Sequence, residues 1–313
     1  MFKRIAMLAL SAVLTTTCFV APSHAAWPEK PVKFLLGSGA GSSIDMVGRL
    51  IAQKLSEKYG KPFVPTNVSG GGLGAFAMTL KNSKNDGYTI GLGTDTMFTF
   101  NSLDPSSRFK MSDYTFLCTI FQGDASYIVA PDKPWKNLRE ALEASKTMSR
   151  PLTYQFQTAM DRKVFEMLAK EVGAKVAIIP MQSPSAGITA VIGGHTDIAF
   201  SGGLHYEQDR AGKVRTITMT TTKRTPNYPD VPTVLELFKI QLPMDAYRLI
   251  VVPKGFPEDV KAQLEKDLKE IIDSPEFSEI VKDKLHFFPA YHNSAETNAI
   301  MEEQLEYCKI FWQ

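Results

Sequence analysis

The sequence predicts an α/β protein with two domains, each a mixed, mostly parallel β-sheet flanked by helices. Three observations support this prediction. The chain has 313 residues, which is too long for a single small domain with one hydrophobic core and suits two domains of ordinary size. Strand-like and helical segments alternate from residue 32 to residue 92, and the alternation returns from 152 to 219. With 44% hydrophobic and 22% charged residues, the composition excludes a disordered or collagen-like chain.

The first alternation has five predicted elements. An apolar run predicts a strand that stops at Gly37. A helix follows, because apolar residues recur at helical spacing until Gly60. A second strand, a shorter helix and a third strand complete the pattern, the last one after the Asp86-Gly87 turn. The predicted segments are 32–36, 44–59, 63–67, 75–80 and 88–92.

The second alternation has the same character, and helices follow it. Its strands and helices are expected at 152–156, 163–171, 176–179, 186–192, 197–200 and 214–219. From Pro257 onward, apolar residues at helical spacing predict a mostly helical C-terminal segment. Extended runs at 126–130 and 249–252 are expected to connect the two units. We therefore expect a first domain of residues 26–125 plus 251–313, a second of residues 126–250, and a ligand cleft between them.

The N-terminal segment 1–25 predicts a secretory signal peptide. Lys3 and Arg4 precede an uncharged apolar run from Ile5 to Val20, and Ser23-His24-Ala25 provides small residues for cleavage after Ala25. A membrane anchor is the alternative, but the run is shorter than the ~20 apolar residues that cross a bilayer. Cys18 raises a lipoprotein alternative, but the three threonines before it do not fit such a site. The mature protein is expected in the periplasm.

Removing this segment takes away two basic residues and no acidic one, so the formal charge of +2 falls to zero. Without a basic stripe, nucleic acid is not expected as a partner. Cys118 and Cys308 remain in the mature chain, 190 residues apart, and the sequence leaves open whether they pair.

The glycine- and serine-rich loop 37–43 lies between a predicted strand and a predicted helix. Unpaired backbone N–H groups and the helix dipole favour an anion there, and Ser42 or Ser43 can donate a hydroxyl. The alternative is a plain turn with a serine cap. Asp45 and Arg49 have the spacing of an ion pair within the helix. The third glycine of a dinucleotide-binding motif is replaced by Ser42, so no nicotinamide or other cofactor is expected.

Further loops are expected at the same edge of each sheet, where the carboxyl ends of parallel strands meet and ligands bind. In the first unit these are 69–74 and 93–96; in the second they are Gln157-Thr158 and 180–187. No lysine or arginine lies in these loops. We therefore expect a cleft of neutral N–H and O–H groups, with water, that holds a small anion without a buried positive charge.

The sequence lacks the patterns of common catalytic sites. No G-x-S-x-G or H-E-x-x-H motif occurs, and the histidines of the mature chain have no metal-ligand spacing to one another. Cys118 follows apolar residues, which is typical of a buried, inert thiol. An enzyme and a metal site are therefore not expected.

An ordered set of motifs resembles the extracytoplasmic substrate-binding proteins of the tripartite tricarboxylate transporters, the Bug family. The resemblance runs from Trp27 to the C-terminus. Its most specific part extends from Lys223-Arg224 through Pro229-Asp230-Val231-Pro232-Thr233-Val234 to Glu236. The other carriers are Trp27-Pro28-Glu29-Lys30-Pro31, Gly41 with Asp45 and Arg49, Asn67 with the glycine loop, Asp86-Gly87-Tyr88-Thr89 with Gly93-Thr94, and Gly193-Gly194 with Asp197.

The resemblance implies a type II periplasmic-binding-protein fold, the Venus flytrap, that closes on a carboxylate. It also implies a receptor that delivers a small organic acid to integral-membrane permease subunits; a monomer is expected. In the family, the loops matching 38–43 and 181–187 hold the carboxylate. Here Ser42, Ile44, Met181-Gln182-Ser183 and Ala186 depart from the family pattern, which suggests an altered carboxylate clamp.

Together, the loops and the resemblance give the candidate ligand-binding residues. They are Ser38, Gly39, Gly41, Ser42, Ser43, Asp45, Gly70, Gly71, Thr94, Asp95, Gln157, Thr158, Gln182, Ser183, Ser185 and Asp197. The alternative function is a sensor of the same fold that feeds a signalling system. A secreted enzyme is a third, weaker hypothesis.

Overall fold

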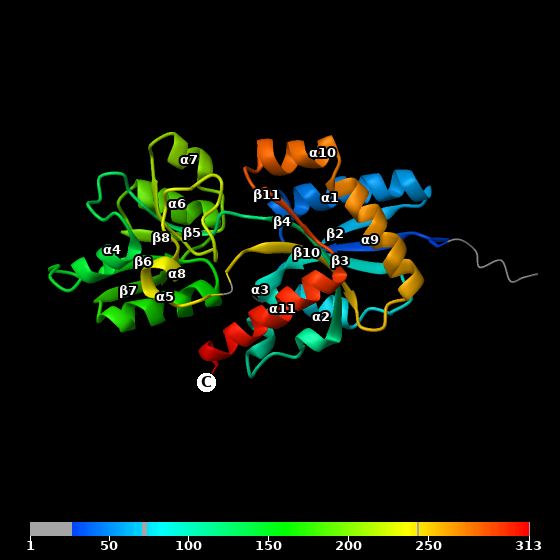
Figure 1. Cartoon of the computed structure of the whole chain (residues 1–313), viewed down its shortest axis with the longest axis horizontal. Coiled ribbons are helices and arrows are strands. Elements are labelled where there is room, and N and C mark those ends of the chain that lie inside the picture. Colours follow the sequence, from blue (N-terminus) through cyan, green and yellow to red (C-terminus); the bar gives the residue numbers. More distant parts are fainter. Residues whose placement is uncertain (1–26, 71–73, 243, 313) are drawn as a thin grey trace, which may run out of the picture.

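The computed structural model describes residues 27–70, 74–242 and 244–312. The predicted signal peptide with its cleavage site, and the candidate residue Gly71, lie outside the described residues. The described chain forms two β-sheets, one in each half of the molecule, with helices packed around both (Figure 1). The predicted mixed α/β fold class is confirmed.

The first sheet has six strands in the order β11-β4-β10-β3-β1-β2. Strands β1, β2 and β3 pair in parallel, and β10, β4 and β11 add antiparallel pairs. Its strands are β1 Val32–Leu36, β2 Phe63–Asn67, β3 Thr89–Thr94, β4 Tyr114–Gln122, β10 Tyr247–Pro253 and β11 Phe288–His292. The helices of this half are α1 Ser43–Tyr59, α2 Gly74–Lys81, α3 Asp95–Thr99, α9 Glu258–Ile272, α10 Pro275–Ser278 and α11 Ser294–Cys308.

Helix α1 shows why these residues form these elements. Ser42 caps its first turn, since its side chain accepts a hydrogen bond from the Asp45 N–H. Gly60 ends the helix in the left-handed region, with φ of 64°. Between them, the apolar side chains at helical spacing are buried in the core beside the first sheet.

The sequence prediction missed strand β11 within the segment expected to be helical. Its residues are all half-buried, so they show no alternation of apolar and polar faces. Pro289 lies within it, which is tolerated because β11 is the edge strand of the sheet.

The second sheet has five strands in the order β7-β6-β8-β5-β9. Strands β7, β6 and β8 are parallel, and β5 is antiparallel to both of its neighbours. Its strands are β5 Ser126–Val129, β6 Leu152–Phe156, β7 Val176–Pro180, β8 Ile198–Ser201 and β9 Arg215–Met219. The helices of this half are α4 Leu138–Ala144, α5 Ala159–Val172, α6 Pro184–Ile192, α7 Tyr206–Arg210 and α8 Val234–Phe238.

The chain passes between the sheets twice, at places adjacent to those that the sequence predicted. The run 126–130 does not cross but contains β5, and the run 249–252 lies inside β10. The crossings are the segments that precede these strands, after β4 and before Tyr247 (Figure 1). The predicted domain boundary at residue 250 therefore lies within a strand of the first sheet.

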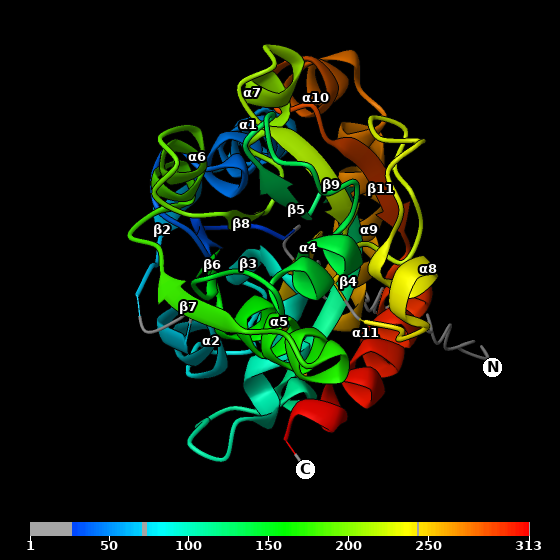
Figure 2. The ribbon, with the colours of Figure 1, turned by 90° about the vertical axis from the view of Figure 1, so that its left-hand side faces the viewer.

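The C-terminal end also reaches the second half. The end of α11 lies beside α5 (Figures 1 and 2), and Cys308 and Trp312 belong to the hydrophobic cluster of the second sheet. Lys163 of α5 donates a hydrogen bond to the carbonyl of Phe311 at 2.9 Å.

In the described chain Cys118 and Cys308 are both free and buried, and burial raises the pKa of the Cys308 thiol to about 12. No helix of the described ranges has the length and apolar character needed to cross a bilayer.

Candidate functional site

A pocket of about 270 Å³ lies between the two sheets. Residues from both halves line it, and it includes the ends of β1, β3 and β6 that the sequence predicted to face a cleft. A wider space of about 900 Å³ continues from it, and five residues line both. These shared residues are Thr96, Gln157, Thr158, Met160 and Pro184.

The loop after β1 is held in shape by the Asp45 carboxylate, which lies behind it. Asp45 accepts hydrogen bonds from the Gly41 N–H, from Arg49 Nε and from Asn67 Nδ2, all at 2.9 Å. Burial opposes ionisation of this carboxyl, but the bonds from Arg49, Gly41 and Asn67 keep its pKa below the usual range. The predicted Asp45–Arg49 ion pair is present. Asp45 does not line the pocket, and its hydrogen bonds stabilise the conformation of the loop from behind.

The same loop presents four of the predicted residues to the pocket, namely Ser38, Gly41, Ser42 and Ser43. Gly39 is not among the lining residues. Gly41 has φ of 77°, a conformation that favours glycine. Ser42 both caps α1 and lines the pocket, so the capping and binding interpretations of this serine are compatible.

At the end of β3, Thr94 and Asp95 line the pocket, as predicted. The Asp95 carboxylate is buried, and both of its oxygens are already hydrogen-bonded. One accepts from the Thr96 N–H at 2.7 Å, and the other from the Tyr247 N–H at 3.1 Å and from Gln304 Nε2 at 3.2 Å. Burial raises the pKa of Asp95 to about 6, although Arg248 acts in the opposite direction.

Across the pocket, Gln157 and Thr158 lie between β6 and α5, as predicted. Thr158 and Asp161 cap α5 reciprocally, which explains why this helix starts at Ala159, earlier than its apolar spacing indicated. Gly70 and Gln182 line the wider outer space. Ser183 and Ser185 line neither space, although Pro184 between them lines both. Ser183 caps α6, and its hydroxyl lies 3.1 Å from that of Ser185.

Asp197 also lines neither space, and it lies at the end of β6 that is far from the pocket. It contacts Thr153 in the first half of β6, whereas Gln157 follows the opposite end of that strand. Arg150 donates two hydrogen bonds to its carboxylate at 2.6 and 2.8 Å, and Lys133 donates one at 2.9 Å. Burial opposes its ionisation, but Arg150, Thr153 and Lys133 hold the pKa of Asp197 well below its usual range.

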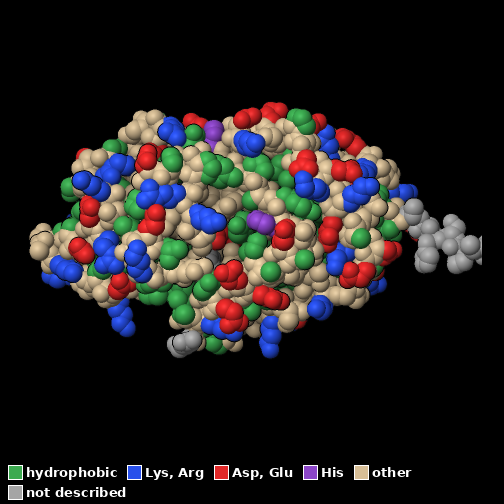
Figure 3. Space-filling view, in the orientation of Figure 1, with side chains coloured by type: hydrophobic (Ala, Val, Ile, Leu, Met, Phe, Trp, Pro, Cys, Tyr) green, Lys and Arg blue, Asp and Glu red, His purple; other side chains and the backbone are tan. Residues whose placement is uncertain are grey.

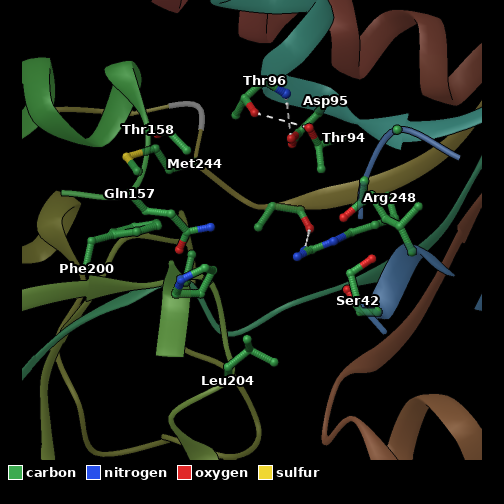
Figure 4. Close-up of a pocket in the computed structure, with 18 of the residues that line it drawn as sticks. Ser42, Thr94, Asp95, Thr96, Gln157, Thr158, Phe200, Leu204, Met244 and Arg248 are labelled. Carbon is green, nitrogen blue, oxygen red and sulfur yellow. Dashed lines mark hydrogen bonds between the residues drawn. The ribbon is translucent and has the colours of Figure 1, made fainter. Parts of the chain in front are cut away.

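The prediction of a cleft without cationic groups is wrong, because Arg248 of β10 lines the pocket. Its guanidinium extends toward the centre of the pocket, between Ser42 and Gln157 (Figure 4). Arg248 lies opposite Thr94 in the pairing of β10 with β3, and this long-range register brings it to the site. A local signal was present, since Arg248 directly precedes the apolar run 249–252.

The rest of the lining is largely apolar. We call Met160, Phe200, Leu204, Met244 and Phe287 the apolar wall. The described residues contain no group of three or more His, Cys, Asp or Glu side chains that could hold a metal ion. The arrangement provides hydroxyls, backbone N–H groups, one amide and one guanidinium around a small cavity, which suits the binding of a small anion.

The face of the molecule in Figure 3 has no extended basic patch. Acidic and basic side chains are interspersed over the face in Figure 3, and no stripe of one sign crosses it. The visible face therefore offers no electrostatic footprint of the kind that nucleic-acid-binding proteins use.

Comparisons with known proteins agree with the fold and the motifs. A family model described as the tripartite tricarboxylate transporter family receptor matches residues 47–311. A protein of Cupriavidus necator, the UPF0065 protein in gbd 5'region, is 25% identical over 272 residues, which cover 86% of this chain and 83% of that protein.

Two solved structures have a similar fold. The adipate-bound Rpa4515 of R. palustris has a TM-score of 0.75 and 20% identity, covering 91% of this chain and 97% of its own. The malate-bound MatC of Rhodopseudomonas palustris has a TM-score of 0.73 and 19% identity, covering 92% and 100%. Together with the two sheets, these likenesses confirm the predicted periplasmic-binding-protein fold.

Proposed function

The chain belongs to the tripartite tricarboxylate transporter receptor family, and we propose that it captures a small organic acid in the periplasm. The protein then delivers this acid to the integral-membrane permease subunits of such a transporter. The predicted signal peptide 1–25, cleaved after Ala25, provides its export. Within this proposal the protein is a receptor, not an enzyme, and works as a monomer without a cofactor.

The observation that carries this proposal is a small pocket between two sheets, lined from both sides by hydrogen-bond donors. Ser38 and Ser42 lie on one side, and Gln157 and Thr158 on the other. Donors on opposite sides meet a ligand together only when the two halves approach each other, so ligand binding favours the closed state. Sites of this kind are common where two domains meet.

We propose that the ligand contacts the predicted residues that line the pocket or its outer space. They are Ser38, Gly41, Ser42, Ser43, Gly70, Thr94, Asp95, Gln157, Thr158 and Gln182. The sequence predicted domains of residues 26–125 plus 251–313 and of residues 126–250. We propose these two domains with both boundaries moved to the ends of strands, the first to near Gly123 and the second to just before Tyr247, where β10 starts.

Isothermal titration of the purified mature protein tests the proposal. The panel contains mono-, di- and tricarboxylates, with neutral sugars and organic cations as controls. We expect saturable binding of at least one carboxylate. Binding of sugars or cations without any carboxylate contradicts the proposal, and so does enzymatic turnover of a bound acid.

A further inference from the structure

The Arg248 side chain is buried in the pocket with incomplete hydrogen bonding. The residue is 9% exposed, and its Nε has no hydrogen-bond partner. One Nη donates to the carbonyl of Ala246. Burial lowers the pKa of Arg248 to about 10, so the guanidinium is still protonated at neutral pH. A buried charge with unmet donors destabilises a folded protein unless something compensates it.

Within the described chain, Asp95 is the carboxylate that stabilises the Arg248 charge, and it acts by electrostatic attraction without a hydrogen bond. Its oxygens bond to Thr96, Tyr247 and Gln304, and none of them bonds to the guanidinium. Asp95 therefore positions the strand that carries Arg248, through the neighbouring Tyr247 N–H. Apart from the Nη atom that donates to Ala246, the donors of Arg248 remain available to an anion.

Neighbouring groups fix the guanidinium on its other sides. The rings of Phe121 and Phe287 stack on each other, and Arg248 Cζ lies 5.5 and 5.2 Å from their centroids. Gly123 lies so close that an added Cβ would stand 2.8 Å from an Nη atom. A planar guanidinium held in this way is suited to a carboxylate, which it can bind with two parallel hydrogen bonds.

The remaining lining limits what can be attached to that carboxylate. Arg248 is the one Lys, Arg or His side chain among the described lining residues of the pocket. The apolar wall lines one part of the remaining space and the Ser, Thr and Gln side chains line another, and Leu204 in the wall is 52% exposed. Ser42 and Gln157 lie on either side of the guanidinium, so their donors can serve the same carboxylate as Arg248. A second carboxylate against the apolar wall or beside Asp95 would have no matching cation, whereas an apolar body would cover Leu204.

We infer that Arg248 binds the carboxylate of the ligand directly, and that the preferred ligand is a small monocarboxylate with an aryl or alkyl body. This inference rests on the proposed function and narrows it to a substrate class. A volume of about 270 Å³ agrees with a small body.

The first experiment titrates benzoate, hexanoate, adipate and malate into the wild-type protein. We expect benzoate or hexanoate to bind at least about tenfold more tightly than malate, because an apolar body gains contact with the apolar wall. Tighter binding of malate or adipate overturns the inferred substrate class and leaves the proposed function standing. Failure to bind any carboxylate contradicts both.

The second experiment tests Arg248 with the tightest of these acids. Arg248→Met removes the charge and keeps an apolar side chain; we expect affinity to fall about 100-fold, the size of a charge-assisted contact. Without ligand, its melting temperature should be no lower than that of the wild type, since a buried unpaired charge is gone. Arg248→Lys keeps the charge without the planar fork and should lose about tenfold.

The matched control is Arg162→Met, which removes an exposed arginine paired with Glu166 and outside the pocket lining. We expect its affinity to stay within about twofold of the wild type. Wild-type affinity in both folded Arg248 variants overturns the assignment of the anchor, while carboxylate binding by the wild type keeps the proposed function. If Arg248→Met does not fold, Arg248→Lys decides the matter.

Discussion

Asp197 and Arg248 are both buried charged side chains near strand ends, and their surroundings differ. Asp197 is held by Arg150, Lys133 and Thr153, and these partners keep it ionised. Arg248 has one backbone acceptor and no carboxylate in contact within the described chain. The first charge is compensated by the fold itself. The charge of Arg248 is available to an anion that enters the pocket.

This difference separates two roles that a sequence motif does not distinguish. A compensated charge belongs to the folded structure, and removing it destabilises the protein because its partners are left unpaired. An uncompensated charge weakens the empty protein and strengthens the ligand complex. We therefore expect Asp197 variants to change stability without affinity, and Arg248 variants to change affinity without loss of stability.

The largest effect on stability is expected for Asp197→Asn. Removing the carboxylate charge leaves Lys133 and Arg150 without their partner and weakens the bonds from Thr153. We expect the free energy of unfolding to fall by about 3 kcal/mol, measured by urea denaturation. Carboxylate affinity should stay within about twofold. A tenfold loss of affinity at unchanged stability would instead make Asp197 part of the binding site.

Next in size is Ser42→Leu, which tests the neutral side of the pocket. A leucine there removes a hydroxyl and fills space in the cavity, so we expect affinity to fall at least about tenfold in calorimetric titration. The lost cap of α1 should lower stability by about 1 kcal/mol without unfolding the protein. Unchanged affinity in a folded Ser42→Leu protein would show that the site lies elsewhere.

A smaller effect concerns the pH dependence set by Asp95. The pKa of this carboxyl is about 6 in the folded protein and 3.8 in its ordinary state. Its neutral form is therefore favoured by folding: the stability that it contributes is fully present below pH 3.8 and is lost as the pH rises through about 6. Asp245, Arg248 and the bonded N–H groups are the other groups that act on it.

An anion on Arg248 should raise the pKa of Asp95 further. We therefore expect affinity to increase about threefold as the pH falls from about 7 to about 5.5. Asp95→Asn should abolish this increase. Once the Gln304 amide turns over, the new amide can donate to Gln304 Oε1, which has no partner at present. The Tyr247 N–H then loses its acceptor, so the variant should fold with a stability about 1 kcal/mol lower. The same increase in Asp95→Asn would assign the pH dependence to another group.

An effect of the same small size is expected for Gly123→Ala. The added methyl group would lie 2.8 Å from an Arg248 Nη atom and 3.1 Å from the carbonyl of Gly202, so the guanidinium must shift. We expect an affinity loss of about threefold in the wild type and none in the Arg248→Met background. Equal losses in both backgrounds would mean that Gly123→Ala acts on the backbone of the crossing after β4 rather than through Arg248.

Most of the fold was predictable because its signals are local. Apolar spacing and glycines such as Gly37 and Gly60 mark strand and helix ends in the sequence itself. Loops that follow parallel strands must meet at one edge, and Ser38, Ser42 and Gln157 do line one pocket.

The surroundings of Asp197 and the position of Arg248 were not predictable in this way. Asp197 belongs to a family motif, but its partners Arg150 and Lys133 lie 47 and 64 residues away in the sequence. Arg248 reaches the pocket because β10 inserts between β3 and β4 in a register fixed by tertiary pairing. Local sequence patterns predict neither the ion-pair partners of Asp197 nor the register of β10.

A crystal structure of the protein with its tightest-binding carboxylate tests the central claim most directly. We expect the two halves to be closed on the ligand, with a carboxylate oxygen at about 2.8 Å from the Arg248 guanidinium and the body of the ligand against Phe200 and Leu204. A ligand whose carboxylate is held by the loop at Ser38 and Ser42 alone, with Arg248 still bonded to the Ala246 carbonyl only, would contradict the account.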